Sequence, residues 1–227
     1  MSKQAVVIYG PPGSGKGTQA ELLESKYSFI HFDTGKYIES LVHDPELRKN
    51  SLIKREKKLF DSGTLNTPAW VLSIVKDATI KIARAGYSII FSGSPRTLFE
   101  ALGDRSHGGL LAALINLFGR RNITILKLSV RPQTSIKRNS SRLVCSVCGL
   151  PILAASKIKN CALCGAPARK RIFDNPKLIK VRLKQYEDRT LPIIQKAKKL
   201  GLKVVQINGE PAPYKVHASV IRALKLK

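Results

Sequence analysis

The sequence predicts an α/β protein with a five-stranded parallel sheet between two layers of helices. Short apolar runs alternate with longer helical patterns along most of the chain, which is the order expected when helices connect parallel strands. A glycine-rich turn joins the first apolar run directly to the first helical pattern. The strands are expected at Ala5–Tyr9, Phe29–Asp33, Ser88–Ser92, Ile123–Ser129 and Val204–Asn208.

The helices follow from periodicity and from residues typical of helix ends. Thr67 has the side chain of an N-cap, Pro68 follows at the first helical position, and Gly86 ends the pattern. Helices are expected at Gly15–Tyr27, in a charged segment from Pro45 to about Gly63, through Ala85 after Thr67, and from about Pro176 to Leu200.

Two segments interrupt this alternation and are expected to project from the sheet. Residues 34–66 are polar and helical, and residues 142–172 contain all four cysteines with little helical periodicity. The predicted core therefore consists of residues 1–33, 67–141 and 173–227.

Length and charge limit the possible classes of protein. The chain has 227 residues, of which 43% are hydrophobic, and 40 Lys and Arg against 15 Asp and Glu give a net charge of +25. No apolar run is long enough to cross a bilayer, and the first strand begins too early for a signal peptide. We expect a cytoplasmic protein without a membrane partner. The excess charge makes nucleic acid a possible partner, but the basic residues are spread along the chain and a solvated basic surface is favoured.

The nine residues Gly10-Pro11-Pro12-Gly13-Ser14-Gly15-Lys16-Gly17-Thr18 carry the main chemical signal. A glycine-rich turn between a strand and a helix directs backbone N–H groups and the helix N-terminus into one concavity, which suits phosphate oxygens. Lys16 adds a mobile positive charge for the terminal phosphates. The sequence thus predicts a phosphate-binding loop (P-loop) within a three-layer fold.

The cysteines form two pairs with metal-ligand spacing. Cys145 and Cys148, like Cys161 and Cys164, are separated by two residues, and a glycine follows each pair. This spacing lets both thiolates of a pair face one tetrahedral ion, so we expect a structural Zn²⁺. The alternative is a set of redox-active or idle thiols. A segment of this size buries too little apolar surface to fold alone, and the ion would supply the missing stability.

The order of these motifs resembles the adenylate kinases and their nucleoside monophosphate kinase relatives. The form Gly15-Lys16-Gly17-Thr18 is typical of them, and the cysteine segment resembles the zinc lid of some bacterial adenylate kinases. The resemblance covers nearly the whole chain. It implies that residues 34–66 form the monophosphate-binding insertion and that residues 142–172 form a zinc-binding lid. Its further motifs are Thr34-Gly35, Gly63-Thr64-Leu65 and Gly93-Ser94-Pro95-Arg96-Thr97.

This resemblance implies reversible Mg²⁺-dependent transfer of a phosphoryl group from ATP to AMP, giving two ADP, by a monomeric enzyme. Arginines suit this reaction because their planar forks bind phosphate with two hydrogen bonds. The implied catalytic residues are Lys16, Arg96, Arg138, Arg171 and Arg182. The implied ATP site comprises Gly13, Ser14, Gly15, Lys16, Gly17, Thr18, Arg138 and Arg142, with Thr18 as the Mg²⁺ ligand. The implied AMP site comprises Thr34, Gly35, Thr64, Leu65, Asn66, Gly93, Arg96, Glu100, Arg171 and Arg182.

The sequence departs from the family pattern mainly around the acceptor and the metal. Ser92 stands where the family has an aspartate that orders metal-bound water, and Lys36 replaces a second acidic residue. Glu39 replaces an arginine that grips the acceptor phosphate, and Glu100 replaces a glutamine that reads the adenine. Asp33 is near the lost carboxylates, but adjacent strand residues point to opposite faces.

These departures leave two alternatives to an adenylate kinase. Glu100 could accept a hydrogen bond from an exocyclic amine of another base, which would fit a CMP- or UMP-like acceptor. The chain could also bind nucleotide without efficient catalysis and use its basic surface on RNA.

Overall fold

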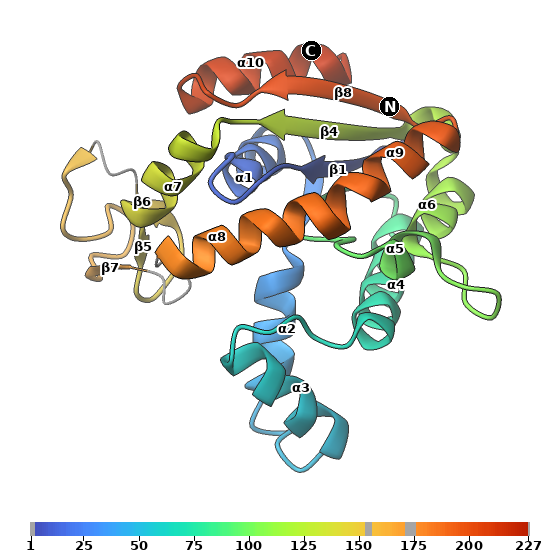
Figure 1. The fold of residues 1–227 in the computed structure, drawn as a ribbon, viewed down its shortest axis with the longest axis horizontal. Coiled ribbons are helices and arrows are strands. Elements are labelled where there is room, and N and C mark those ends of the chain that lie inside the picture. The colour runs from blue at the N-terminus through green and yellow to red at the C-terminus, as the bar shows by residue number, and fades with distance from the viewer. Residues whose placement is uncertain (1–2, 153–155, 171–175, 227) are drawn as a thin grey trace.

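The computed structural model describes residues 3–152, 156–170 and 176–226, and it contains the expected parallel sheet (Figure 1). The strands lie in the order β2-β3-β1-β4-β8, and every neighbouring pair is parallel. All five predicted strands are confirmed. Their bounds are β1 Ala5–Tyr9, β2 Phe29–Phe32, β3 Ser88–Phe91, β4 Ile123–Ser129 and β8 Lys203–Asn208.

The central strand β1 is buried on both faces because helices cover both sides of the sheet. Val6 and Ile8 pack with α1 (Lys16–Lys26) and α10 (Pro213–Leu224). Ala5 and Val7 pack on the other side in a cluster that includes residues of four covering helices and of α2 (Thr34–Val42). A strand that is buried on both faces has apolar residues at every position, which is why β1 could be predicted from the sequence. The four helices of the second face are α4 (Pro68–Arg84), α5 (Leu98–Leu102), α6 (Leu110–Phe118) and α9 (Leu191–Lys199).

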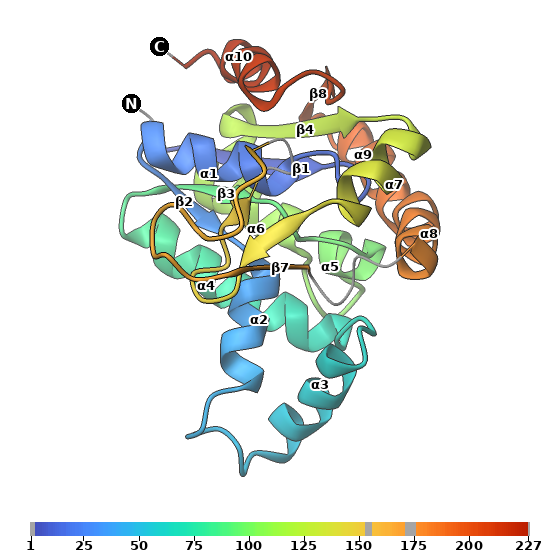
Figure 2. The same cartoon turned by 90° about the vertical axis from the view of Figure 1, so that its left-hand side faces the viewer.

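The segment between β2 and α4 extends away from the sheet as two helices (Figures 1 and 2). They are α2 (Thr34–Val42) and α3 (Ser51–Asp61). The expected helix start at Pro45 is wrong, because residues 45–49 form turns. The side chain of Asn50 instead caps α3 by accepting hydrogen bonds from the N–H groups of Leu52 and Ile53.

Glu56 fastens α3 to the start of α4. Its side chain is fully buried and accepts hydrogen bonds from Asn66 Nδ2 (3.0 Å), Thr67 N (3.0 Å) and Thr67 Oγ1 (2.6 Å), and from Arg55. The hydroxyl of Thr67, expected to cap α4, is therefore used by Glu56, and α4 begins without a side-chain cap. Burial raises the pKa of Glu56, but these hydrogen bonds outweigh it and hold the pKa below its usual range.

Replacing Glu56 by glutamine should destabilise the protein by about 2 kcal/mol, because the amide NH₂ would face donors that now bind a carboxylate. In the wild type, a lowered carboxyl pKa gives stability that is present above the ordinary value near 4.5 and is lost as the pH falls through the lowered value. Thermal unfolding at pH 7 measures the effect. Glu46→Gln, at an exposed position, is the matched control, and equal unfolding temperatures for the two variants would contradict this role.

The expected long helix from Pro176 to Leu200 is interrupted. It consists of α8 (Pro176–Gln185), a π-helical turn η3 (Tyr186–Thr190) and α9. Pro192 has no N–H to donate within the first turn of α9, so a regular α-helical ladder cannot run through this point. The turn widens the helix beside the end of the sheet.

The elements that directly follow β4 lie beyond the carboxyl end of the parallel sheet (Figure 1). After β4 come α7 (Pro132–Ser140) and a small antiparallel sheet in the order β6-β5-β7 (Figure 1). Its strands are β5 Leu143–Cys145, β6 Pro151–Ile152 and β7 Ala168–Lys170. The division into a core, a monophosphate-binding insertion and a lid stays a prediction. No helix among the described residues combines the length and apolar composition that a membrane span requires.

Candidate functional site

The P-loop connects β1 to α1 and depends on glycines at two positions. Gly13 and Gly15 have φ angles of +74° and +93°, which favour glycine. A Cβ on Gly13 would also lie 2.5 Å from Nδ2 of Asn139 on α7. Gly15 is the N-cap of α1 and supplies no side-chain cap, so the first N–H groups of the helix remain available to an anion.

Lys16 is held at the base of this loop. Its ammonium group donates hydrogen bonds to the carbonyl oxygens of Gly10 (2.7 Å) and Pro11 (3.0 Å). Removal from water, followed by repulsion from Arg182, Arg96 and Arg142, lowers the pKa of Lys16 from 10.5 to about 7. The sequence placed Lys16 at the site, but only the packing brings the arginines near it.

Nucleotide binding should therefore be accompanied by proton uptake above pH 7. In the empty site Lys16 is mostly neutral above its pKa of about 7, and a bound polyphosphate raises that pKa by favouring the charged form. Calorimetric titration with ATP at pH 8 in buffers of different ionisation enthalpy should show uptake of up to about one proton. Affinity should fall as the pH rises. The same uptake in Lys16→Met would contradict this assignment.

A cavity of about 110 Å³ lies beside Lys16, at the carboxyl end of the sheet. Arg96, Arg182 and Arg189 line it together with Lys16. The site predictions did not include Arg189, although it is seven residues after Arg182 and so on the same face of a continuous helix. The other lining residues are Ile8, Tyr9, Gly10, Pro12, Leu65, Ser92, Gly93, Ser94, Pro95, Gln185, Tyr186 and Thr190.

Buried hydroxyl groups at this cavity have no hydrogen-bond partner among the described residues. Tyr9 Oη and Ser94 Oγ belong to buried residues, and Tyr186 Oη is likewise without a partner. Burial, then the charge of Glu100, raises the pKa of Tyr9. Buried polar groups are normally hydrogen-bonded, so these hydroxyls are available to a polar ligand. No sequence pattern indicated the two tyrosine hydroxyls, because apolar strands and helices often contain tyrosines for packing alone.

Only some of the residues expected to bind AMP line the cavity. Arg96 Nε donates to the carbonyl oxygen of Gly93 (2.7 Å), and Leu65 is in the cavity wall. Thr34 begins α2, and its buried hydroxyl has no hydrogen-bond partner within the described part of the chain. Gly35 N donates to Asp33 Oδ1.

Thr64 and Asn66 make contacts away from the cavity. Thr64 Oγ1 accepts from Ser62 Oγ, and Asn66 Nδ2 donates to Glu56, so both side chains contribute to the structure around α3. Neither is among the residues that line the cavity. Their expected contacts with AMP stay predictions.

The Glu100 carboxylate binds residues just before it in the sequence. Its carboxylate accepts hydrogen bonds from Arg96 N (2.9 Å) and Thr97 Oγ1 (3.0 Å), while Thr97 caps α5. Burial, the largest influence, raises the pKa of Glu100 even though these bonds lower it. Both oxygens thus have partners before any base is bound. Glu39 is exposed on α2 and does not line the cavity.

The arginines expected at the donor site lie around the P-loop. Arg138 of α7 donates to the carbonyl oxygens of Gly209 (2.8 Å) and Glu210 (2.7 Å), which places its guanidinium beside the loop after β8. Arg142 is close enough to lower the pKa of Lys16. Ser14, Gly17 and Thr18 lie in the P-loop and the first turn of α1. Arg171 lies outside the described residues.

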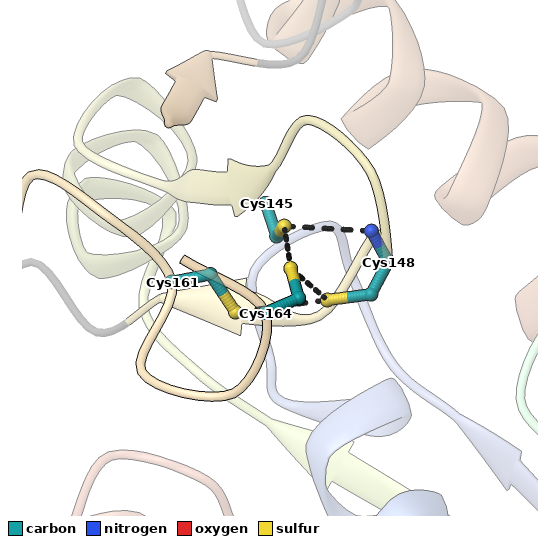
Figure 3. A group of neighbouring side chains, drawn as sticks. All are labelled: Cys145, Cys148, Cys161 and Cys164. Carbon is teal, nitrogen blue, oxygen red and sulfur yellow. Dashed lines mark hydrogen bonds between the residues drawn. The ribbon is translucent and has the colours of Figure 1, made fainter. Parts of the chain in front are cut away.

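The four cysteines converge although they come from two separate turns (Figure 3). Cys145 ends β5 and Cys148 follows it, whereas Cys161 and Cys164 precede β7, whose first residue Ala168 pairs with Cys145. Their sulfur atoms all lie within 4.8 Å of one another, and three pairs are 3.3, 3.7 and 3.8 Å apart. A tetrahedral zinc ion with Zn–S bonds of about 2.3 Å requires sulfur atoms about 3.8 Å apart. Burial raises the pKa of Cys145, but the N–H groups of Cys148 and Val147 lower it more strongly, to about 6. The donor set therefore fits zinc.

The fold and the P-loop define the class of this protein, a P-loop phosphotransferase in which arginines gather at the end of a parallel sheet. The family model described as adenylate kinase matches residues 8–202, and the chain belongs to this family. Enzymes of the family transfer a phosphoryl group to a phosphate acceptor, and the chain is a phosphotransferase of this kind.

Curated relatives support the family assignment over nearly the full chain. The adenylate kinase of Chlamydia pneumoniae is 29% identical over 99% of this chain and 99% of its own length. The adenylate kinase of Methanothrix thermoacetophila is 31% identical, with 90% of each chain covered. That of Caldicellulosiruptor bescii is 30% identical over 90% of this chain and 92% of its own.

Proposed function

We propose that this protein is an adenylate kinase that transfers the terminal phosphoryl group of ATP to AMP. A phosphate oxygen of AMP attacks the γ-phosphorus, the bond from that phosphorus to the β–γ bridging oxygen breaks, and two ADP leave. The observation that carries this proposal is the position of Lys16. Its ammonium group lies at the foot of the P-loop and faces a cavity that Arg96 and Arg182 also line.

The proposed roles follow from this arrangement of charges. The P-loop N–H groups and Lys16 hold the donor phosphates, and Arg96 holds the acceptor phosphate. Arg182, with Arg171, surrounds the group in transfer, while Arg138 and Arg142 lie on the donor side. Catalysis consists of in-line positioning and of positive charge around the transferred group, with no covalent intermediate.

Magnesium fits this site only as a partner of the phosphates. Mg²⁺ takes oxygen ligands, retains several waters, and is usually held by one or two carboxylates with substrate phosphates. The described lining residues offer hydroxyl and carbonyl oxygens and no carboxylate. Thr18 would supply a hydroxyl ligand, and the ion would neutralise charge on the phosphates. The Cys145, Cys148, Cys161 and Cys164 cluster would hold a structural zinc ion.

A coupled assay for ADP formation tests the proposal. ATP with AMP should give turnover well above that with CMP, UMP or GMP at equal concentration. No turnover with any monophosphate would contradict the proposal, and a preference for CMP or UMP would reassign the acceptor. The cytoplasmic location, the monomeric state and the lack of a nucleic-acid partner stay predictions.

A further inference from the structure

The cavity beside Lys16 contains several cations and no carboxylate among its described lining residues. Lys16, Arg96, Arg182 and Arg189 are the charged side chains that line it. Glu100 lies close to Arg96, but both of its oxygens accept hydrogen bonds from Arg96 N and Thr97 Oγ1. A wall of this composition attracts polyanions, whereas a bare divalent cation would meet repulsion.

Ser92 is an uncharged residue of the cavity wall, and it directly follows the carboxyl end of β3. Its Oγ is 2.8 Å from Nε2 of His31, which lies on the neighbouring strand β2. Burial is the largest influence on His31 and lowers its pKa, although Asp33 and Glu24 raise it. The imidazole is therefore mainly neutral at pH 7, and the hydrogen bond fixes Ser92 without adding charge.

The carboxylates near His31 already have partners in the backbone. Asp33 Oδ1 accepts from Gly35 N (3.0 Å) and Lys36 N (3.3 Å) as the cap of α2. Glu24 Oε1 accepts from His31 N (3.0 Å). Neither residue lines the cavity, so neither replaces the carboxylate that a metal would need there.

The positive groups around Lys16 also repel one another. Arg182, Arg96 and Arg142 contribute to the low pKa of Lys16, after the larger effect of its removal from water. An anion bound among them relieves this repulsion, and the relief increases with the charge of the anion. ATP bound to magnesium carries two fewer negative charges than free ATP.

We propose that this cavity binds the polyphosphate chain of ATP more tightly without magnesium than with it, and that Ser92 sets this preference by keeping a carboxylate out of the wall. Ser92 is thus a residue that determines which ionic form of the donor binds. This inference rests on the proposed function of the same site, and it specifies whether ATP binds there more tightly alone or as its magnesium complex.

Calorimetric titration of ATP, once with EDTA and once with excess MgCl₂, tests the inference on the wild type and on two variants. The wild type should show the lower Kd in EDTA. Ser92→Asp should change the ratio of the two Kd values in favour of the magnesium complex by about tenfold or more, as expected for one added charge near the phosphates. Ser92→Asn introduces a side chain of the same shape as aspartate but without its charge, and it should leave the ratio of the two Kd values as in the wild type.

Three results would overturn the inference: equal Kd values in the wild type, tighter binding of the magnesium complex, or equal ratios for Ser92→Asp and Ser92→Asn. Asp33→Asn, which preserves the cap of α2, should leave the ratio unchanged, and a tenfold change would assign the metal to Asp33 instead. Each of these results leaves the proposed function intact. Absence of ATP binding under both conditions would contradict the proposed function itself.

Discussion

Replacing Lys16 by methionine should reduce kcat/KM for ATP and AMP by about 10²-fold or more, the usual cost of removing one group that stabilises charge in the transition state. Methionine has a similar length but cannot provide the positive charge. The affinity for ATP, measured by calorimetry, should fall as well, because the ammonium group meets the phosphates in the bound state.

The same substitution should not destabilise the fold. Without nucleotide, Lys16 is removed from water and repelled by three arginines. Relief of this burial and repulsion should offset the loss of its hydrogen bonds to the carbonyl oxygens of Gly10 and Pro11, so the unfolding temperature should stay close to that of the wild type. Lys26→Met, at the exposed end of the same helix, is the matched control and should leave activity unchanged. If Lys16→Met bound ATP as tightly as the wild type does, the P-loop would not be the donor site.

Replacing Cys161 and Cys164, two of the four proposed zinc ligands, by serine together should unfold the small sheet β5–β6–β7 and leave the parallel sheet folded. The strands of the small sheet have at most three residues each, and structural zinc contributes about 10–16 kcal/mol to such segments. Hydrogen exchange should lose protection in residues 143–152 and 156–170. Protection in β1 and β4 should be retained.

Metal content and a chelator provide the control for this prediction. Reduced wild-type protein purified without added zinc should contain about one zinc ion per chain, as four thiolates satisfy one tetrahedral ion. A chelator should make the wild type resemble the double variant and should not change the variant further. Less than half an equivalent of zinc, or equal loss of protection in β1 and in the small sheet, would contradict the prediction.

The sequence predicted the elements whose signals are local. Ala5–Tyr9 was recognisable because five successive apolar residues followed by a glycine-rich turn have few other structures open to them. The cysteine pairs were recognisable because their spacing alone brings two sulfur atoms to one point. The predicted start of α3 at Pro45 was wrong, because proline is typical of turns as well as of helix starts. The true start depends on Asn50, whose side chain accepts two hydrogen bonds that the sequence alone does not reveal.

Contacts between distant segments could not be predicted in this way. The hydroxyl of Thr67 was expected to cap α4, but Glu56 binds it, because a buried carboxylate needs every donor within reach. The π-helical turn before Pro192 was not expected, since helical periodicity hardly changes across one additional residue.

By itself, then, the sequence determined that this protein has a parallel sheet, a P-loop and two closely spaced pairs of thiols, because each depends on residues a few positions apart. The tertiary structure alone decided that Arg96 and Arg182 surround Lys16 and lower its pKa, and that Ser92 pairs with His31 in the same wall. These features arise where the carboxyl ends of β1, β2 and β3 meet α8, and charge interactions act through space and not along the chain.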